Sequence, residues 1–203
     1  GLNQISYGSE DGLYVNGHVT GNSPYLTFEW KAGKDGEHHE VKTQLIGEYN
    51  FANALAAVTI GHFFDVESGK IDTALKEYTP QNNRSQLKQT ADNTLIIDAY
   101  NANPTSMQAS ISNFHNMEID NKMLILGDMR ELGKDGPKEH QKIVDFLTEC
   151  GFKDVMLVGE QFAAARHDFP TYPDAPAVIE ALQKNKPHGK TILIKGSNGI
   201  KLS

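Results

Sequence analysis

The sequence predicts an α/β fold in which a Rossmann-like open sheet of mostly parallel strands follows a smaller region of β-hairpins and helices. Two observations lead to this prediction. From about residue 81 onward, strands alternate with helices, and strand ends recur about every 30 residues, the length of a βαβ unit. The first 46 residues instead carry short alternating polar and apolar pieces between turn formers, a pattern typical of hairpins.

The first region, residues 1–80, is expected to hold the hairpins and then two helices. Turn formers at residues 21–24 and 33–36 separate the alternating pieces. Residues 50–64 are rich in alanine with apolar positions at helical spacing. Residues 68–78 repeat this spacing behind Ser68, which we expect to be the N-cap of the second helix.

The second region, residues 81–203, begins at the turn formers around Pro80. Compact apolar runs predict four strands buried on both faces of a parallel sheet, at residues 94–98, 123–128, 155–159 and 191–195. Helices are predicted at residues 104–114, 137–150 and 176–185, each with a proline near the first turn, where a missing N–H is tolerated. Cys150 lies on the apolar side of the second helix and is expected to be buried.

Composition and charge exclude several classes of function. Nineteen Lys and Arg against 26 Asp and Glu give a net charge of −7, which argues against binding to a nucleic-acid backbone. A single cysteine and the lack of a charged-then-apolar leader favour a cytoplasmic protein. No apolar run approaches the roughly 18 residues that a membrane span requires. The eight histidines lack the spacing of metal ligands, so we expect no metal site.

A polar residue stands at the end of each of the four predicted strands, and these residues are Asp98, Asp128, Glu160 and Lys195. Ligands of open α/β sheets bind outside the carboxyl ends of the strands, so these side chains are candidates to line one binding edge. Strand ends are also where polar residues are ordinarily tolerated. Asp98 stands out, because residues 98–106 combine a carboxylate, a tyrosine, amides and hydroxyls before a helix. Within that segment, Asn103 is explained as an N-cap.

Three further residues are candidates for contacts with a nucleotide. Arg84, in the boundary turn, presents a planar fork suited to phosphate, although a solvated loop charge is the more common explanation for such a residue. Asn50 and Asn53 lie three residues apart on one helical face, and Asn50 alone would be an ordinary N-cap. Residues 189–191 resemble the end of a Walker A loop but lack its first glycine and its strand context. The chain therefore has no triphosphate loop of its own.

Five motifs, in this order, resemble the C-terminal half of a Mur ligase. They are GEYNFANALAA at 47–57, NNRS at 82–85, DAYNANPTSM at 98–107, LGDMRELG at 126–133 and KGSNGIKL at 195–202. The third and fourth are most similar to the branch that adds D-alanyl-D-alanine. The resemblance implies that residues 1–80 are the C-terminal part of a central ATP-binding domain and that residues 81–203 form the C-terminal Rossmann-like domain. Tyr49 departs from the family, where histidine is frequent.

The resemblance implies an ATP-dependent amide ligase of peptidoglycan precursor synthesis. The γ-phosphoryl group of ATP would pass to the terminal carboxylate of UDP-MurNAc-tripeptide, and the amine of D-alanyl-D-alanine would displace phosphate from the acyl phosphate. ATP and Mg²⁺ would be bound mainly by an upstream Walker A domain, so we expect the chain alone to be inactive. Asn50 and Asn53 would contact the adenine and ribose side, Arg84 the phosphates and Asp98 the ribose hydroxyls.

Four residues along the same predicted edge are further candidates to contact the dipeptide or to act in domain closure, namely Tyr100, Asn101, Asp128 and Lys195, and charge adds Glu131. Asp128 or Glu131 would hold the incoming ammonium group, and a lysine would hold the dipeptide carboxylate. Two alternatives stay open. One is a non-catalytic Rossmann-like module that binds a nucleotide or a peptide, and the other is a related ligase such as folylpolyglutamate synthase, which shares the architecture.

Overall fold

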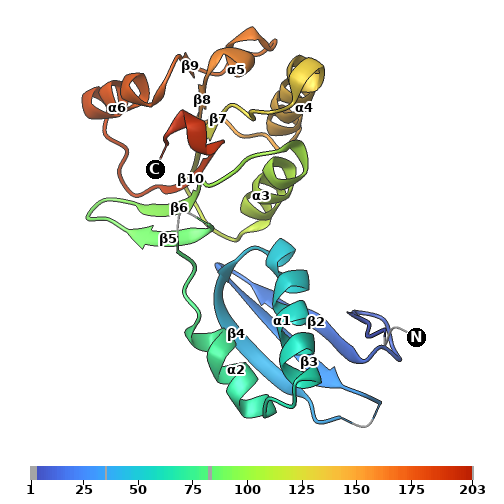
Figure 1. The fold of residues 1–203 in the computed structure, drawn as a ribbon. Helices are drawn as coiled ribbons and strands as arrows, with labels where there is room; N and C mark the ends of the chain where they lie inside the picture. The colour runs from blue at the N-terminus through green and yellow to red at the C-terminus, as the bar shows by residue number, and fades with distance from the viewer. Residues whose placement is uncertain (1–3, 35, 82–83, 203) are drawn as a thin grey trace. The chain divides into compact units, whose positions relative to one another are not determined.

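The computed structural model describes residues 4–34, 36–81 and 84–202. By its contacts the chain divides into two compact units, Gly1–Pro80 and Gln81–Ser203, which are coloured from blue to green and from green to red in Figure 1. Each unit has its own sheet and its own core, and each is described separately below.

The first unit contains a four-stranded sheet in the order β1-β2-β3-β4, and the predicted hairpins are confirmed. The strands are β1 (Tyr7–Gly8), β2 (Val15–Asn22), β3 (Tyr25–Ala32) and β4 (His39–Ile46). β2, β3 and β4 are antiparallel, whereas the short β1 pairs with β2 in parallel. Of the predicted turn at residues 33–36, Asp35 lies outside the described residues.

Two helices follow the sheet, α1 (Phe51–Phe63) after the 3-10 turn η1 (Glu48–Asn50), and α2 (Ser68–Glu77). Both predicted helices are thus confirmed. Their apolar side chains pack against the strands in a cluster that includes Phe28, Trp30, Leu55 and Ile71. α1 also exposes the apolar side chains of Ile60 and Phe63, and its C-cap residue Phe64 is exposed as well.

Ser68 is not the N-cap of α2, so that prediction is wrong. The N-cap is Glu67, and no side chain caps the helix. Helix α2 is fixed instead by its packing and by Asp72, whose carboxylate accepts hydrogen bonds from Trp30 Nε1 (2.9 Å) and His39 Nδ1 (2.8 Å). Tertiary contacts therefore replace the local cap.

The second unit contains a six-stranded sheet in the order β5-β6-β10-β7-β8-β9. The strands are β5 (Gln86–Gln89), β6 (Thr94–Asp98), β7 (Lys122–Gly127), β8 (Val155–Val158), β9 (Thr171–Tyr172) and β10 (Thr191–Lys195). All four predicted strands are present. The sheet is parallel except for β5, which runs antiparallel to β6. The last strand, β10, lies between β6 and β7 in the middle of the sheet.

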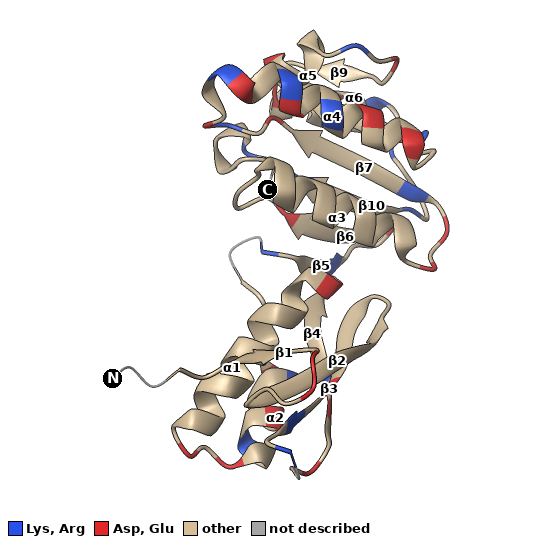
Figure 2. Ribbon diagram, turned by 90° about the vertical axis from the view of Figure 1, so that its right-hand side faces the viewer, with Lys and Arg blue, Asp and Glu red and all other residues tan. Residues whose placement is uncertain are grey.

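Helices cover both faces of this sheet, as Figure 1 shows. α3 (Pro104–Asn116) packs beside α4 (Gly136–Glu149), which contacts α5 (Glu160–Ala164), whereas α6 (Ala175–Lys184) packs against β8 and β9. The turns η2 (Gly133–Asp135) and η3 (Asn198–Ile200) complete the unit. In Figure 2 the charged residues of α4 and α6 stand out against the mostly uncharged β6 and β10. The fold class is the predicted α/β class.

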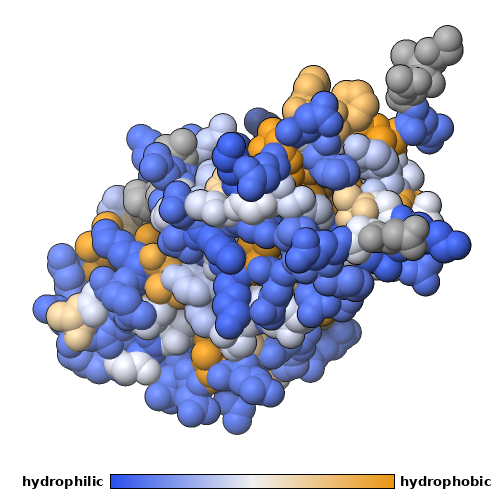
Figure 3. Space-filling view, turned by 90° about the horizontal axis from the view of Figure 1, so that it is seen from below, coloured by the Kyte–Doolittle hydropathy of each residue, from blue (hydrophilic) through white to orange (hydrophobic). Residues whose placement is uncertain are grey.

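Cys150 differs from its prediction, because it is only partly buried at the end of α4. Partial burial, with a smaller contribution from the neighbouring Glu149 carboxylate, raises the pKa of the Cys150 thiol above its ordinary value. Seen from below in Figure 3, the surface is largely hydrophilic with scattered hydrophobic patches. Among the described residues, no helix is long and apolar enough to cross a bilayer.

Candidate functional site

The carboxyl edge of the six-stranded sheet gathers most of the candidate residues of the second unit. Its parallel strands all end at this edge, and β6 ends at Asp98 while the neighbouring β10 ends at Lys195. The antiparallel β5 begins at the same edge, since Gln86 pairs with Ile97. Arg84, two residues before β5, is therefore brought to the end of β6.

Asp98 and Lys195 are direct register partners on adjacent strands. Because side chains alternate along a strand, the two project from the same face of the sheet. Lys195 Nζ donates to Asp98 Oδ2 at 2.5 Å. Lys195 is only 1% exposed, and its ammonium lies in the interior beneath the carboxylate. The sequence predicts that a lysine holds the dipeptide carboxylate, and in the structure the Lys195 ammonium is paired with Asp98.

Arg84 and Tyr100 form a stacked pair at the end of β6. The guanidinium carbon of Arg84 lies 3.9 Å from the centroid of the Tyr100 ring, a cation–π geometry. Tyr100 is 47% exposed and follows Asp98 by two residues, so the stack holds a cation beside the Asp98–Lys195 pair. Asn82 and Asn83, which precede Arg84 in the same motif, lie outside the described residues.

The loop after Asp98 is shaped by local hydrogen bonds. Asn101 Oδ1 accepts from the backbone N–H of Ala102 at 2.8 Å. Asn103 caps α3 as predicted, because its side chain accepts from the N–H of Ser106, and Ser106 Oγ accepts from the N–H of Asn103. This capping box fixes the direction in which the loop leaves β6.

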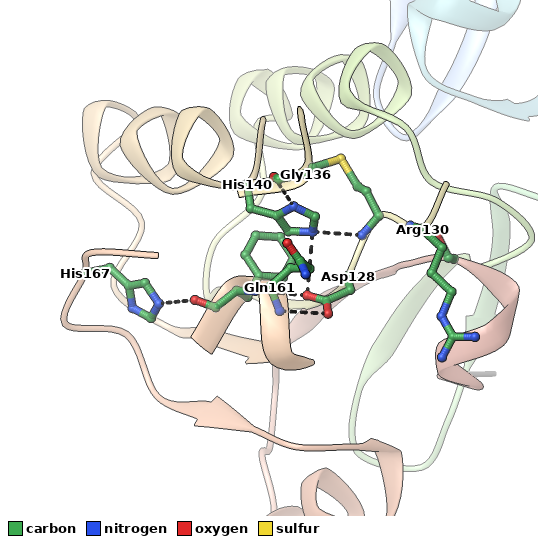
Figure 4. Close-up of polar contacts among 9 residues, drawn as sticks. Asp128, Arg130, Gly136, His140, Gln161 and His167 are labelled. Atoms are coloured by element: carbon green, nitrogen blue, oxygen red, sulfur yellow. Dashed lines mark hydrogen bonds and ion pairs between the residues drawn. The ribbon is translucent and has the colours of Figure 1, made fainter. Parts of the chain in front are cut away.

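Asp128, after β7, acts as a cap for the short helix α5. Its Oδ2 and Oδ1 accept hydrogen bonds from the backbone N–H groups of Gln161 and Phe162, both at 3.0 Å (Figure 4). Gly159 permits this approach: its φ is 117°, and a Cβ there would lie 2.3 Å from the Asp128 carboxylate. Both Asp128 oxygens are thus engaged within the domain.

His140 is a fully buried residue that the sequence analysis did not single out. Its Nε2 accepts from the N–H of Met129 (3.0 Å), so the ring proton lies on Nδ1, which donates to the Gly136 carbonyl (2.7 Å). The Phe162 ring packs edge-on against the imidazole, with 4.7 Å between the two ring centroids. The burial of His140 could have been predicted from the spacing of α4, because His140 precedes the apolar Ile143 by three residues and so lies on the same face of the helix.

A pocket of about 430 Å³ opens beside Asp128 at the ends of β7 and β8. Its lining includes Arg130, Glu131, Glu160 and Ile200. Figure 4 shows the Arg130 side chain turned away from the Asp128–His140 cluster. Among the described residues, no hydrogen bond or ion pair engages the Glu131 carboxylate or the Arg130 guanidinium. The pocket therefore combines acidic and basic side chains with apolar ones.

In the first unit, Asn50 and Asn53 lie side by side at the start of α1. Asn53 Nδ2 donates to Asn50 Oδ1 at 3.4 Å, and Asn50 Nδ2 donates to the Ile46 carbonyl at 2.8 Å. Asn50 occupies the N-cap position of α1 without capping it through its side chain. No group of three or more His, Cys, Asp or Glu side chains in the described ranges is placed to hold a metal ion.

An open, mostly parallel α/β sheet with polar and charged groups along its carboxyl edge defines a Rossmann-like ligand-binding domain. Residues 83–198 match the family described as "Mur ligase, glutamate ligase domain", and the chain belongs to the Mur ligase family. This confirms the resemblance found in the motifs.

Several relatives carry the name of one branch of the family. The UDP-N-acetylmuramoyl-tripeptide–D-alanyl-D-alanine ligase of Bacillus subtilis (strain 168) is 28% identical over 99% of this chain and 47% of its own length. That of Escherichia coli (strain K12) is 29% identical over 93% of the chain and 42% of its length. The chain spans about half the length of the relatives it matches.

Solved structures agree with the fold. A crystal structure of MurF from Acinetobacter baumannii superposes with a TM-score of 0.82, at 25% identity, over 97% of this chain and 44% of that chain. MurF ligase from Thermotoga maritima in complex with ADP gives 0.80 at 17% identity, over 98% and 46%. Folylpolyglutamate synthase from Thermotoga maritima gives 0.62 at 13% identity, over 92% and 44%.

Proposed function

We propose that this chain is the C-terminal half of a cytoplasmic ATP-dependent ligase that joins D-alanyl-D-alanine to UDP-MurNAc-tripeptide. Residues 1–80 would belong to its central ATP-binding domain and residues 81–203 would form its C-terminal domain. The observation that carries the proposal is the gathering of Arg84, Tyr100 and Asp98 at one sheet edge in a chain whose relatives are ligases of this kind.

The proposed chemistry has two steps. The γ-phosphoryl group of ATP passes to the terminal carboxylate of the tripeptide, releasing ADP and forming an acyl phosphate. The free amine of D-alanyl-D-alanine then attacks the acyl carbon, and phosphate leaves as the amide forms. Mg²⁺ would be bound mainly by the upstream half, as the resemblance to the Mur ligases implies.

In this proposal the residues of the chain bind and orient ATP. The guanidinium of Arg84 is suited to the phosphates, and the partly exposed Asp98 carboxylate is suited to accept hydrogen bonds from the ribose hydroxyls. Asn50 and Asn53, whose amides already lie within reach of each other, would contact the adenine and ribose side. The stacked Tyr100 ring limits the positions open to Arg84, which lowers the entropy lost when phosphate binds.

For the second substrate, we propose the pocket beside Asp128. Both Asp128 oxygens already accept backbone N–H groups, so Glu131 is the better partner for the incoming ammonium group. Tyr100 and Asn101, on the loop after Asp98, are proposed as further contacts to substrate. The pocket is large enough for a small dipeptide.

The experiment is a phosphate-release assay on the full-length ligase expressed with its upstream half. Release that requires both UDP-MurNAc-tripeptide and D-alanyl-D-alanine supports the proposal, and release with a folate and glutamate instead would favour folylpolyglutamate synthase. Asp98→Ala should raise the KM for ATP more than the KM for the dipeptide, and the reverse order would remove the ribose assignment.

The isolated chain gives a second test, by calorimetry with ATP. Weak binding or none is expected, since the chain lacks a triphosphate loop. A sub-micromolar affinity would contradict the proposal that ATP is bound mainly by the upstream half, and it would favour a non-catalytic nucleotide-binding module.

A further inference from the structure

Lys195 is an unusual residue for the middle of a parallel sheet. It ends β10, which lies between β6 and β7, and its register partners are Asp98 on one side and Leu126 on the other. The preceding residues of the strand, such as Ile192 and Leu193, are the apolar residues typical of this position. Lys195 is as buried as they are, at 1% exposure.

Stability alone does not account for a lysine at this position. Moving an ammonium group out of water costs free energy that a single ion pair returns only in part, and apolar residues often replace such pairs without loss. A methionine or leucine would fill the same volume without that cost. We therefore look for the role of the Lys195 charge in its effect on Asp98.

The two side chains of the pair differ in their access to solvent. The Lys195 side chain is 2% exposed, whereas that of Asp98 is 16% exposed. Lys195 Nζ holds Asp98 Oδ2 from the interior side. Within the described part of the chain, the other oxygen, Oδ1, receives no hydrogen bond. One carboxylate oxygen is thus fixed from behind while the other stays free to accept from a ligand.

We propose that Lys195 is a positioning residue that sets the sugar specificity of the nucleotide site by holding Asp98 in one orientation. The free oxygen of Asp98 then faces vicinal hydroxyl groups, which donate to a fixed carboxylate more strongly than to a mobile one. The proposal rests on the assignment of Asp98 to the ribose under the proposed function. It gives Lys195 no direct contact with either substrate.

The test compares three variants of the full-length ligase. Lys195→Met removes the charge and keeps the length of the side chain, and Lys195→Arg keeps the charge. Lys190→Met is the matched control, because Lys190 directly precedes the same strand, at its other end, and forms an ion pair with Asp154 at 2.8 Å. Each enzyme is assayed for the KM of ATP, the KM of D-alanyl-D-alanine, and kcat/KM with ATP, 2′-deoxy-ATP and 3′-deoxy-ATP.

Lys195→Met is expected to raise the KM for ATP by about tenfold or more, because the reoriented Asp98 carboxylate would lose a hydrogen bond from the ribose, and a hydrogen bond to a charged group has about this effect. The KM for the dipeptide should change by less than about twofold, since the interaction lies at the nucleotide. The preference for ATP over the deoxynucleotides should fall towards unity. Lys195→Arg should recover part of that preference, and Lys190→Met should match the wild type.

Equal rises in both KM values, with the preference for ATP retained, would overturn the proposal, because a merely structural lysine would act in that way. A wild-type enzyme that accepts ATP and the deoxynucleotides equally would instead remove the ribose assignment of Asp98 and leave the ligase assignment standing. If thermal melting shows that Lys195→Met does not fold, Lys195→Gln, which keeps a donor without the charge, is compared with Lys195→Arg on the same preference.

Discussion

The buried and partly buried polar side chains of the second unit each interact with one or two partners. Asp98 is balanced by a buried ammonium, Asp128 by two backbone N–H groups, and His140 by one donor and one acceptor. Among the described residues of the second unit, no buried side-chain nitrogen or oxygen atom lacks a hydrogen-bond partner, as the cost of an unpaired buried group requires. Removal of one partner therefore leaves the other buried without a hydrogen bond and lowers the free energy of unfolding.

Asp98→Ala should lower the free energy of unfolding of the second unit by about 3 kcal/mol, because it leaves the Lys195 ammonium buried and unpaired. Urea denaturation of the chain measures this. Glu180→Ala is the control, since the Glu180–Lys184 pair is about 70% exposed at both side chains. Its effect should stay within about 0.5 kcal/mol. Similar losses for the two variants would show that the Asp98–Lys195 pair is not buried in solution.

The Cys150 thiol is expected to react slowly at neutral pH. Partial burial and the Glu149 carboxylate raise its pKa, so the reactive thiolate is scarcer than in an unfolded chain and becomes abundant only as the pH rises above the ordinary thiol range. The rate of reaction with a disulfide reagent, measured against pH in the native and the urea-unfolded chain, tests this. A native rate at pH 7 equal to or above the unfolded rate would contradict it.

At the scale of elements, strands and helices were predictable where apolar periodicity was long. The strands at residues 94–98 and 191–195 and the helix beginning at Pro104 are found where the pattern predicts them. β9 and α5 were missed because they are too short to show a period, and β5 because Gln86–Gln89 is mostly polar. The Ser68 cap failed because packing at Asp72 overrides the local signal.

The candidate site was predictable in part. The polar residues at the strand ends follow from the sequence, as does their place at one sheet edge. The contact between Asp98 and Lys195 does not, because it depends on β10 entering between β6 and β7, and strand order leaves no local trace in the chain. The role of Asp128 as a cap also depends on α5, an element without a periodic signal.

The cap of α5 provides a test at this scale. Asp128→Ala should cost about 1 to 2 kcal/mol, the range for loss of a helix cap, and should speed hydrogen exchange at the amides of Gln161 and Phe162. Asp145→Ala is the control, since Asp145 is exposed on α4 and its side chain accepts a hydrogen bond from the exposed Gln141 side chain. Unchanged protection at those two amides in Asp128→Ala would show that α5 does not depend on Asp128.

At the scale of the whole chain, the two units differ in how complete they are. The second unit has helices on both faces of its sheet and a continuous apolar core. The first unit has helices packed against its sheet, and α1 leaves Ile60, Phe63 and Phe64 exposed. Exposed apolar side chains that cluster along one element are typical of surfaces covered by other protein.

Residues 81–203 expressed alone should therefore fold, with a single cooperative thermal transition followed by circular dichroism. Residues 1–80 alone should associate or aggregate, as size-exclusion chromatography would show. A second unit that melts without cooperativity, or a first unit that is monomeric and folded, would contradict this division of stability.

The burial of Lys195 affects its reactivity towards chemical labels. Amine-reactive labels modify lysines that meet solvent, so Lys195 should escape acylation in the native chain while Lys184, at a 70% exposed side chain, reacts freely. Labelling at Lys195, followed by mass spectrometry, would then report each excursion in which the edge of the sheet opens. Labelling of this one buried lysine therefore measures how often the carboxyl edge of the six-stranded sheet opens.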